Sequence, residues 1–267
     1  MYSNKNGDDD FFARYIFGLL KMRDAIYPTN ERLEYDRSFG PVFQNLLEAK
    51  YAKEWAIDLI NRHNVDIEQG KDGIVQGHQL NINNPIDNEL NIFFKEVFIR
   101  GSIAIDCLIK HTEFMGYGIS FLFSEDSKKN KKGIKRFPIP ETDDRFIYLQ
   151  QLIHTNRKKW YTQFREMRRK IEHAGYKLPE IKHFVDNKGK VRSNYPTIEG
   201  QTIEEVMNIC WNNLSMLCEE VIVYITSLKL PEHLIVVMIP PEHRDKLLPI
   251  KYDVRLKDFP SATFSRS

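Results

Sequence analysis

The sequence predicts a mainly α-helical protein, a bundle of about five long helices with a small β-hairpin and short C-terminal strands. Apolar residues recur at helical spacing through most of the chain. Two segments, 87–116 and 201–230, are apolar on nearly every face, which is typical of central helices. Strand-like alternation dominates only in the tail. We therefore expect one helical domain over residues 1–267, with residues 231–267 forming a β-containing extension packed on it.

The composition is that of an ordinary globular protein. Of the 267 residues, 42% are hydrophobic and 28% are charged, and no apolar run approaches the ~20 residues of a membrane span. Cys107, Cys210 and Cys218 show no CxxC spacing and lie in apolar helical patterns, so we expect reduced, buried thiols. Because the N-terminal residues are acidic where a signal peptide is basic, we expect a cytoplasmic protein without a membrane partner.

The first helices are predicted from apolar spacing and boundary residues. Segment 9–26 is amphipathic and is stopped by residues 27–30, which include Pro28. Segment 41–63 opens with a proline, a residue favoured in the first helical turn. Residues 64–87 are rich in Asn and Gly and are predicted to be a long connection.

The central segment 87–116 carries charged groups that are costly to bury unless they are paired, namely Glu96, Arg100 and Asp106. A second connection, 117–142, contains six basic residues in the nine positions 128–136. We expect all three tryptophans to lie in the core because each falls in a helical pattern: Trp55, Trp160 and Trp211.

The second half of the chain begins with the longest predicted helix, from Thr142 as N-cap to Gly175 as C-cap. A hairpin follows over residues 184–191. The segment 201–230 opens with Thr202 and, three residues later, Glu205, the pattern of a capping box. Residues 234–239 and 250–256 then have the periodicity of strands.

The charge is distributed unevenly although the net charge is only +2. Between Lys128 and Arg192 there are 19 Lys and Arg against 7 Asp and Glu, a balance of +12, and the rest of the chain has a balance of −10. A basic segment on an acidic background either binds something anionic or pairs with the rest of its own fold.

Several familiar sites are absent from the sequence. It has no Gly-rich phosphate loop, no GxGxxG after a strand, no HExxH and no GxSxG. The eight histidines are too dispersed for a metal site. We therefore expect no cofactor and no metal.

The end of the long helix, residues 164–176, places an imidazole beside several guanidinium groups. His173 at the helix C-terminus is suited to acid/base work, because the helix dipole favours its protonated form and nearby arginines oppose it. The arginines can bind a phosphate and stabilise the extra charge of a phosphorane-like transition state.

The run Arg168-Arg169-Lys170-Ile171-Glu172-His173 fits the R-x4-6-H signature of the HEPN superfamily, and the nearby Gly175 is also similar to that family's pattern. The chain thus resembles a family of α-helical proteins associated with nucleotides and RNA. The resemblance implies a helical bundle, frequently a homodimer, in which Arg and His face a cleft. Many members are metal-independent ribonucleases, in which His helps to activate the ribose 2′-OH and Arg holds the scissile phosphate. Arg168 and His173 are the residues that carry over as catalytic.

The resemblance and the helical wheel favour different arginines. Active members usually have a polar residue, often Asn, directly after the Arg, and here that residue is Arg169. On an ideal helix, Arg165, Arg169 and His173 lie opposite the apolar stripe, whereas Arg168 borders it. Arg168 is favoured by the resemblance and Arg169 by the wheel. Several members also pair the Arg with an acidic residue, for which Asp106 and Glu96 are both candidates.

The sequence hypothesis is therefore an HEPN-like protein that binds RNA or nucleotide, with possible endoribonuclease activity. The expected phosphate-binding residues are Arg169, Arg165, Lys170, Lys131 and Lys132, and Tyr161 and Tyr176 are candidates for stacking on a base. The alternative is a non-enzymatic interaction or scaffold module in which the basic helix docks onto an acidic partner surface. A third option is binding of a free nucleotide without cleavage.

Overall fold

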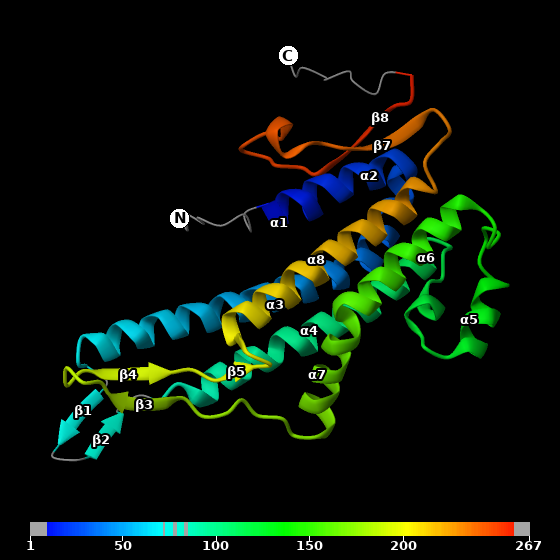
Figure 1. Ribbon diagram of the computed structural model, residues 1–267. Helices are drawn as coiled ribbons and strands as arrows, with labels where there is room; N and C mark the ends of the chain where they lie inside the picture. The colour runs from blue at the N-terminus through cyan, green and yellow to red at the C-terminus, as the bar shows by residue number, and fades with distance from the viewer. Residues whose placement is uncertain (1–9, 72, 77–78, 83–84, 259–267) are drawn as a thin grey trace. The chain divides into compact units, whose positions relative to one another are not determined.

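A computed structural model describes residues 10–71, 73–76, 79–82 and 85–258 (Figure 1). The predicted mainly helical fold is confirmed. The helical elements are α1 (Asp10–Phe12), the π-helical turn η1 (Ala13–Gly18), α2 (Leu19–Ile26), α3 (Thr29–Glu68), α4 (Asp87–Phe114), the 3-10 turn η2 (Ser120–Phe123), α5 (Ser127–Ile134), α6 (Asp144–Asn156), the π-helical turn η3 (Arg157–Tyr161), α7 (Thr162–His173), α8 (Ile203–Ser227) and the 3-10 turn η4 (Pro241–His243).

The described strands form antiparallel pairs. They are β1 (Gly73–Gln76) with β2 (Gln79–Ile82), β3 (Lys182–Val185) with β4 (Val191–Asn194), β5 (Thr197–Ile198) with β6 (Gln201–Thr202), and β7 (Leu234–Met238) with β8 (Tyr252–Leu256). The predicted hairpin around 184–191 is confirmed, with Val185 opposite Val191. The predicted C-terminal strands are confirmed as β7 and β8, with Val236 opposite Val254.

Internal contacts divide the chain into two compact units. The first unit comprises Met1–Phe43, Asp106–Thr155 and Met216–Ser267. The second comprises Gln44–Ile105 and Asn156–Ser215. Residues 231–267 belong to the first unit, and the basic helix α7 belongs to the second.

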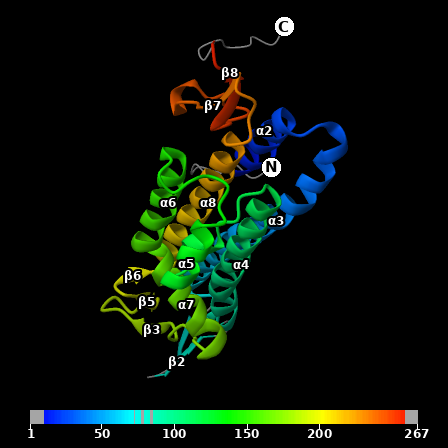
Figure 2. The same ribbon diagram turned by 90° about the vertical axis from the view of Figure 1, so that its right-hand side faces the viewer.

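The first unit buries one face of the N-terminal helices. Phe11, Tyr15, Leu19 and Met22 recur at helical spacing and are all buried, which explains why α1, η1 and α2 follow one another without a break. Strand β8 lies against α2 (Figures 1 and 2), and Lys21 on α2 forms an ion pair with Asp253 on β8. Residue 9, predicted to open this helix, lies outside the described residues.

The predicted stop of the first helix at residues 27–30 is confirmed by the end of α2 at Ile26, whereas the predicted helix start at Pro41 was wrong. Helix α3 begins at Thr29 rather than at Pro41, and Pro28 precedes it, with the Glu31 N–H donating to the Pro28 carbonyl at 2.9 Å. Pro41 lies inside α3. Phe39 and Val42 are buried on either side of it, so burial of this face offsets the backbone hydrogen bond that an internal proline removes.

Both predicted connections contain regular structure. Helix α3 continues to Glu68, and the pair β1–β2 occupies much of the remainder of 64–87. The basic stretch 128–136 lies largely in α5, a short helix. The Asp126 carboxylate caps α5 by accepting from the Lys128 N–H at 2.8 Å and the Lys129 N–H at 3.3 Å. The cap stabilises a short helix in a segment that is too polar to have the apolar periodicity by which a helix is predicted from sequence.

The caps of the later helices follow the sequence closely. The capping box of α8 is confirmed: the Glu205 N–H donates to Thr202 Oγ1 at 3.2 Å, and Glu205 Oε2 accepts from the Thr202 N–H at 2.8 Å. At α6 the cap is Asp143 rather than Thr142, because the Asp143 carboxylate accepts from the Arg145 N–H at 2.8 Å. Gly175, with φ +62°, terminates α7 as expected.

The charged residues of α4 are accommodated without an unpaired buried charge. Arg100 forms ion pairs with Glu96 at 2.9 Å and with Glu48 of α3 at 2.7 Å, and Asp106 is exposed.

Two of the three tryptophans, Trp160 and Trp211, are buried as predicted. The prediction for Trp55 was wrong, because its side chain is 57% exposed. Among the described helices, none combines the length and the apolar character needed to cross a bilayer.

Candidate functional site

The basic helix α7 is held by one apolar stripe that it shares with η3. Trp160, Phe164 and Ile171 are buried, as the helical wheel predicts. The Phe164 ring stacks on Phe98 of α4 with centroids 5.3 Å apart. A Cβ atom at Gly101 of α4 would lie 2.9 Å from Phe164 Cζ, so the glycine permits this close approach. The packing fixes which side of α7 faces outward.

The two motif residues are joined through the carboxylate between them. Arg168 Nη2 lies 2.9 Å from Glu172 Oε1, and His173 Nε2 lies 3.8 Å from Glu172 Oε2. The second contact becomes an ion pair when the imidazole is protonated. Arg168 is half-buried and His173 is 71% exposed. Glu172 therefore holds Arg168 and faces His173 at the end of the helix.

The outer side of α7 carries cations that no carboxylate neutralises. Arg165, Arg169 and Lys170 are exposed and, within the described part of the chain, have no ion pair. The Arg165 guanidinium lies 6.0 Å from the centroid of the Tyr161 ring. Arg169 and His173 are one helical turn apart, so their side chains share a face. This face offers cationic groups beside an accessible imidazole.

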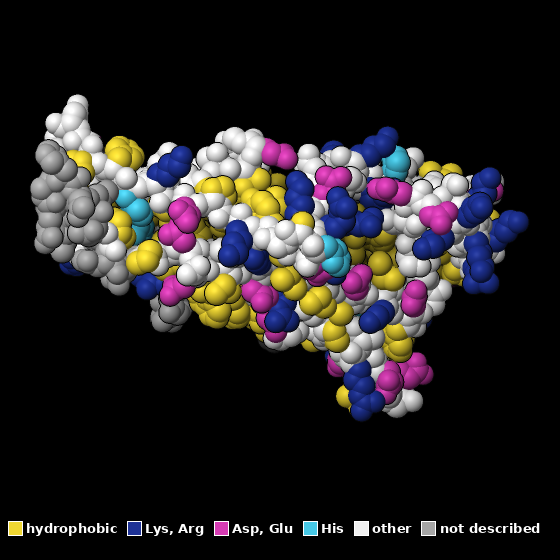
Figure 3. Space-filling model, turned by 90° about the horizontal axis from the view of Figure 1, so that it is seen from below, with side chains coloured by type: hydrophobic (Ala, Val, Ile, Leu, Met, Phe, Trp, Pro, Cys, Tyr) yellow, Lys and Arg dark blue, Asp and Glu magenta, His cyan; other side chains and the backbone are white. Residues whose placement is uncertain are grey.

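The remaining predicted site residues lie outside α7. Lys131 and Lys132 are exposed on α5 in the first unit, whereas α7 belongs to the second. Glu96 is engaged by Arg100. Tyr161 and Tyr176 are half-buried, and the Tyr176 ring lies 6.3 Å from that of Phe94. Figure 3 shows Lys and Arg side chains interspersed with Asp, Glu and exposed hydrophobic side chains on one face of the molecule.

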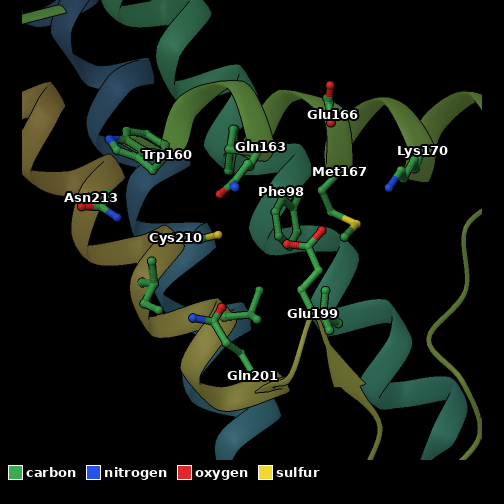
Figure 4. Close-up of a pocket in the computed structure, with 14 residues that line it drawn as sticks. Phe98, Trp160, Gln163, Glu166, Met167, Lys170, Glu199, Gln201, Cys210 and Asn213 are labelled. Carbon is green, nitrogen blue, oxygen red and sulfur yellow. The ribbon is translucent and has the colours of Figure 1, made fainter. Parts of the chain in front are cut away.

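A groove that sequence analysis missed lies beside the same helix, within the second unit. It has a volume of about 110 Å³ and is formed by α7, α8, the β5–β6 hairpin and Phe98 of α4 (Figure 4). Its apolar walls include Phe98, Trp160, Phe164, Met167, Val206 and Ile209. Its polar groups are Gln163, Glu166, Lys170, Glu199, Gln201 and Asn213. The i, i+3, i+4, i+7 spacing of Gln163, Glu166, Met167 and Lys170 is the only trace of this groove in the sequence.

The polar side chains of the groove differ in direction. Figure 4 shows the Glu199 carboxylate rising toward Phe98 and Met167 and the Gln163 amide pointing into the groove, whereas Glu166 points away from it. Cys210 also faces the groove. Burial raises the pKa of its thiol to about 12, so the sulfur is protonated and weakly nucleophilic.

No group of three His, Cys, Asp or Glu side chains that could hold a metal ion occurs in the described ranges. The chain matches no protein-family model, no curated protein and no solved structure.

Proposed function

We propose that this protein binds RNA through the outer side of α7 and cleaves it without a metal ion, as an HEPN-like endoribonuclease. The observation that carries the proposal is the group of exposed, unpaired cations, Arg165, Arg169 and Lys170, on the same helix as the accessible His173. Cations free of carboxylate partners are available to phosphate oxygens, and displacement of counterions from RNA favours that exchange.

The proposed reaction is transesterification within the RNA backbone. The ribose 2′-oxygen attacks the adjacent phosphorus and loses its proton to a base, while the bond to the 5′-oxygen breaks and that oxygen takes up a proton. The products are a 2′,3′-cyclic phosphate and a 5′-hydroxyl end. His173 serves as the general base or acid, and an arginine stabilises the charge on the phosphorane-like transition state.

The contacts favour a division of labour between the two arginines. Arg169 is exposed, unpaired and one turn from His173, so it is the better placed to hold the scissile phosphate. Arg168 is bound to Glu172, and Glu172 approaches His173. We assign Arg168 to positioning Glu172 and, through Glu172, the imidazole of His173.

Cleavage of a single-stranded RNA in EDTA tests the activity. We expect His173→Ala to abolish cleavage and Arg169→Ala to reduce it, whereas His154→Ala, an exposed histidine on α6, leaves it unchanged. Cyclic-phosphate ends on the products identify the reaction. Cleavage that persists in the His173→Ala protein would refute the assigned mechanism.

Binding is measured separately from cleavage, with a DNA–RNA chimera lacking the attacking 2′-OH. For single strands, the salt dependence of binding has a log–log slope of about −0.7 for each phosphate contact. Arg165→Ala, Arg169→Ala and Lys170→Ala should each make the slope less negative by about that amount. Arg62→Ala, which removes an exposed arginine paired with Asp58 on α3, is the matched control.

The same salt-dependence measurement on a Lys131→Ala, Lys132→Ala double variant tests whether α5 contributes to RNA binding. The absence of binding at low salt would refute the RNA proposal.

A second candidate function, a non-enzymatic interaction module, is favoured by a different observation. Trp55 is 57% exposed and stacks on exposed Tyr51 with ring centroids 6.0 Å apart, and Phe93 lies 5.8 Å from Trp55. Exposed tryptophan and tyrosine are enriched among the residues that dominate binding energy at protein interfaces. The resemblance also implies a homodimer, which a mass measurement in solution tests. A Trp55→Ala protein that loses self-association but keeps RNA cleavage would separate the two functions.

A further inference from the structure

The groove beside α7 has the chemistry of a nucleobase site, and we propose that it holds the guanine base of an RNA whose backbone lies on the outer side of α7. This inference rests on the proposed RNA binding and adds a base preference to it.

The size of the groove fits one ring system rather than a whole ligand. Pockets that bury an entire drug-sized molecule are roughly 300–1,000 Å³. This groove has a volume of about 110 Å³ and opens beside Lys170, which is exposed at its rim. A ligand seated here must therefore extend outside, as an RNA chain does when a single unstacked base enters a pocket.

The walls suit a flat, partly polar group. The buried rings of Phe98, Trp160 and Phe164 line the groove, and the Trp160 ring is fixed by its indole N–H, which donates to Asn156 Oδ1 at 2.8 Å. The amides of Gln163, Gln201 and Asn213 offer both donors and acceptors around this surface. Aromatic faces combined with side-chain hydrogen bonds to base edges are how proteins read unstacked RNA bases.

Glu199 selects among the bases. Its carboxylate points into the groove (Figure 4), and no Lys or Arg of the described residues forms an ion pair with it. An ionised carboxylate only accepts hydrogen bonds. Guanine presents two adjacent donors, N1–H and N2–H, which match the two carboxylate oxygens. Adenine and cytosine offer one exocyclic amino group on that edge, and uracil offers a single ring N–H.

The backbone supports a role for this particular side chain. Glu199 has φ 53° and Gly200 has φ 85°, the two positive values of a type I′ hairpin turn between β5 and β6. The first position of such a turn is strongly preferred by Asn, Asp or Gly, and a glutamate there is conformationally unfavourable. Residues held in such conformations cluster at ligand sites. Turn stability therefore does not explain why a glutamate stands here, whereas binding does.

Titration with the four nucleoside 5′-monophosphates, followed by calorimetry and tryptophan fluorescence, tests the site. We expect GMP to bind more tightly than AMP, CMP or UMP. Glu199→Gln and Glu199→Asn should weaken GMP binding by roughly 5- to 150-fold, the range for loss of a bidentate base contact. Glu199→Asn also suits the turn, so its loss of binding cannot be ascribed to unfolding. Glu180→Gln, an exposed carboxylate that does not line the groove, should have no effect.

The outcomes separate this inference from the proposed activity. Equal affinity for all four nucleotides, no nucleotide binding, or unchanged GMP affinity in both Glu199 variants would overturn the guanine site, whatever the cleavage assay shows. GMP binding that depends on Glu199, in a protein that cleaves no RNA, would retain the site and reject the nuclease. When both hold, cleavage should occur beside guanines in the native protein and lose that preference in Glu199→Gln.

Discussion

Glu172 joins Arg168 and His173, with one carboxylate oxygen 2.9 Å from the Arg168 guanidinium and the other 3.8 Å from the imidazole. The arginine of the motif is thus already occupied by a residue of the same motif. A phosphate that binds Arg168 must compete with this carboxylate, whereas Arg169 is free to bind one without such competition.

Replacement of Glu172 tests that competition. Glu172→Gln frees the Arg168 guanidinium, so we expect tighter RNA binding at low salt and little change in stability, because an i, i+4 ion pair on a helix contributes only about 0.2–0.5 kcal/mol. Fluorescence anisotropy and urea denaturation measure the two effects. Weaker RNA binding by this variant would contradict the competition, and Glu180→Gln, an exposed carboxylate that does not line the groove, is the control.

Gly101 is predicted to be essential for packing α7 on α4. A Cβ atom at this position would lie 2.9 Å from both Phe164 Cζ and Leu214 Cδ2. Gly101→Ala should therefore destabilise the protein by about 1–3 kcal/mol, as overpacking of a core does. Gly40 in α3 is the comparison, because, apart from its two chain neighbours, a Cβ atom there would have nothing within 4 Å of it; the new methyl group meets the adjacent Pro41 ring alone, so Gly40→Ala should change stability by less than about 1 kcal/mol. Equal effects in denaturant unfolding would refute this account.

The tryptophans should differ sharply in their contribution to stability. Trp211 is 2% exposed and Trp55 is 57% exposed. Trp211→Ala should cost about 3–5 kcal/mol of unfolding free energy, because it leaves a cavity in the core. Trp55→Ala should cost less than about 1 kcal/mol. A large loss for Trp55→Ala would show that this ring supports the fold instead of an interface.

Buried His111 predicts a pH dependence of stability. Its ring packs against Tyr35 with centroids 4.8 Å apart, and its Nδ1 lies 2.8 Å from Ser38 Oγ. Burial lowers the pKa of His111 to about 4. Between that value and its ordinary value near 6.5, the unfolded chain binds the proton and the folded protein does not.

Stability should therefore fall as the pH is lowered from about 6.5 to 4, with His111 contributing about 3 kcal/mol of the loss. Urea unfolding across this range measures it. His111→Gln should flatten the curve, whereas the exposed His154→Gln should leave its slope unchanged. An identical slope in the His111→Gln protein would contradict the assignment.

The turn at Glu199 supplies a prediction independent of any ligand. Because a glutamate with positive φ is disfavoured at the first position of a type I′ turn, Glu199→Asn should stabilise the hairpin, by up to ~1 kcal/mol. Thermal unfolding without nucleotide measures this gain. A lower melting temperature would show that the Glu199 side chain makes a stabilising contact.

The sequence by itself determined the features that depend on neighbouring residues. Thr202 and Glu205 complete a capping box through contacts three residues apart, and the hairpin at 184–191 follows from a turn between two short apolar runs. The buried stripe of α7 and its exposed basic side follow from helical periodicity alone. These features are local, so the chemical signal lies within one or two turns of the chain.

Only the tertiary structure decided which helical surfaces are covered. Pro41 marks a helix start in isolation, but burial of Phe39 and Val42 carries α3 through it. Trp55 lies in a core-like pattern, yet its side chain is 57% exposed, because burial depends on what packs opposite a face. The groove joins side chains from α4, α7, α8 and the β5–β6 hairpin, which are far apart in sequence. Periodicity identifies the apolar face of a helix, but the partner that covers it and the spaces left between partners arise only when the whole chain packs.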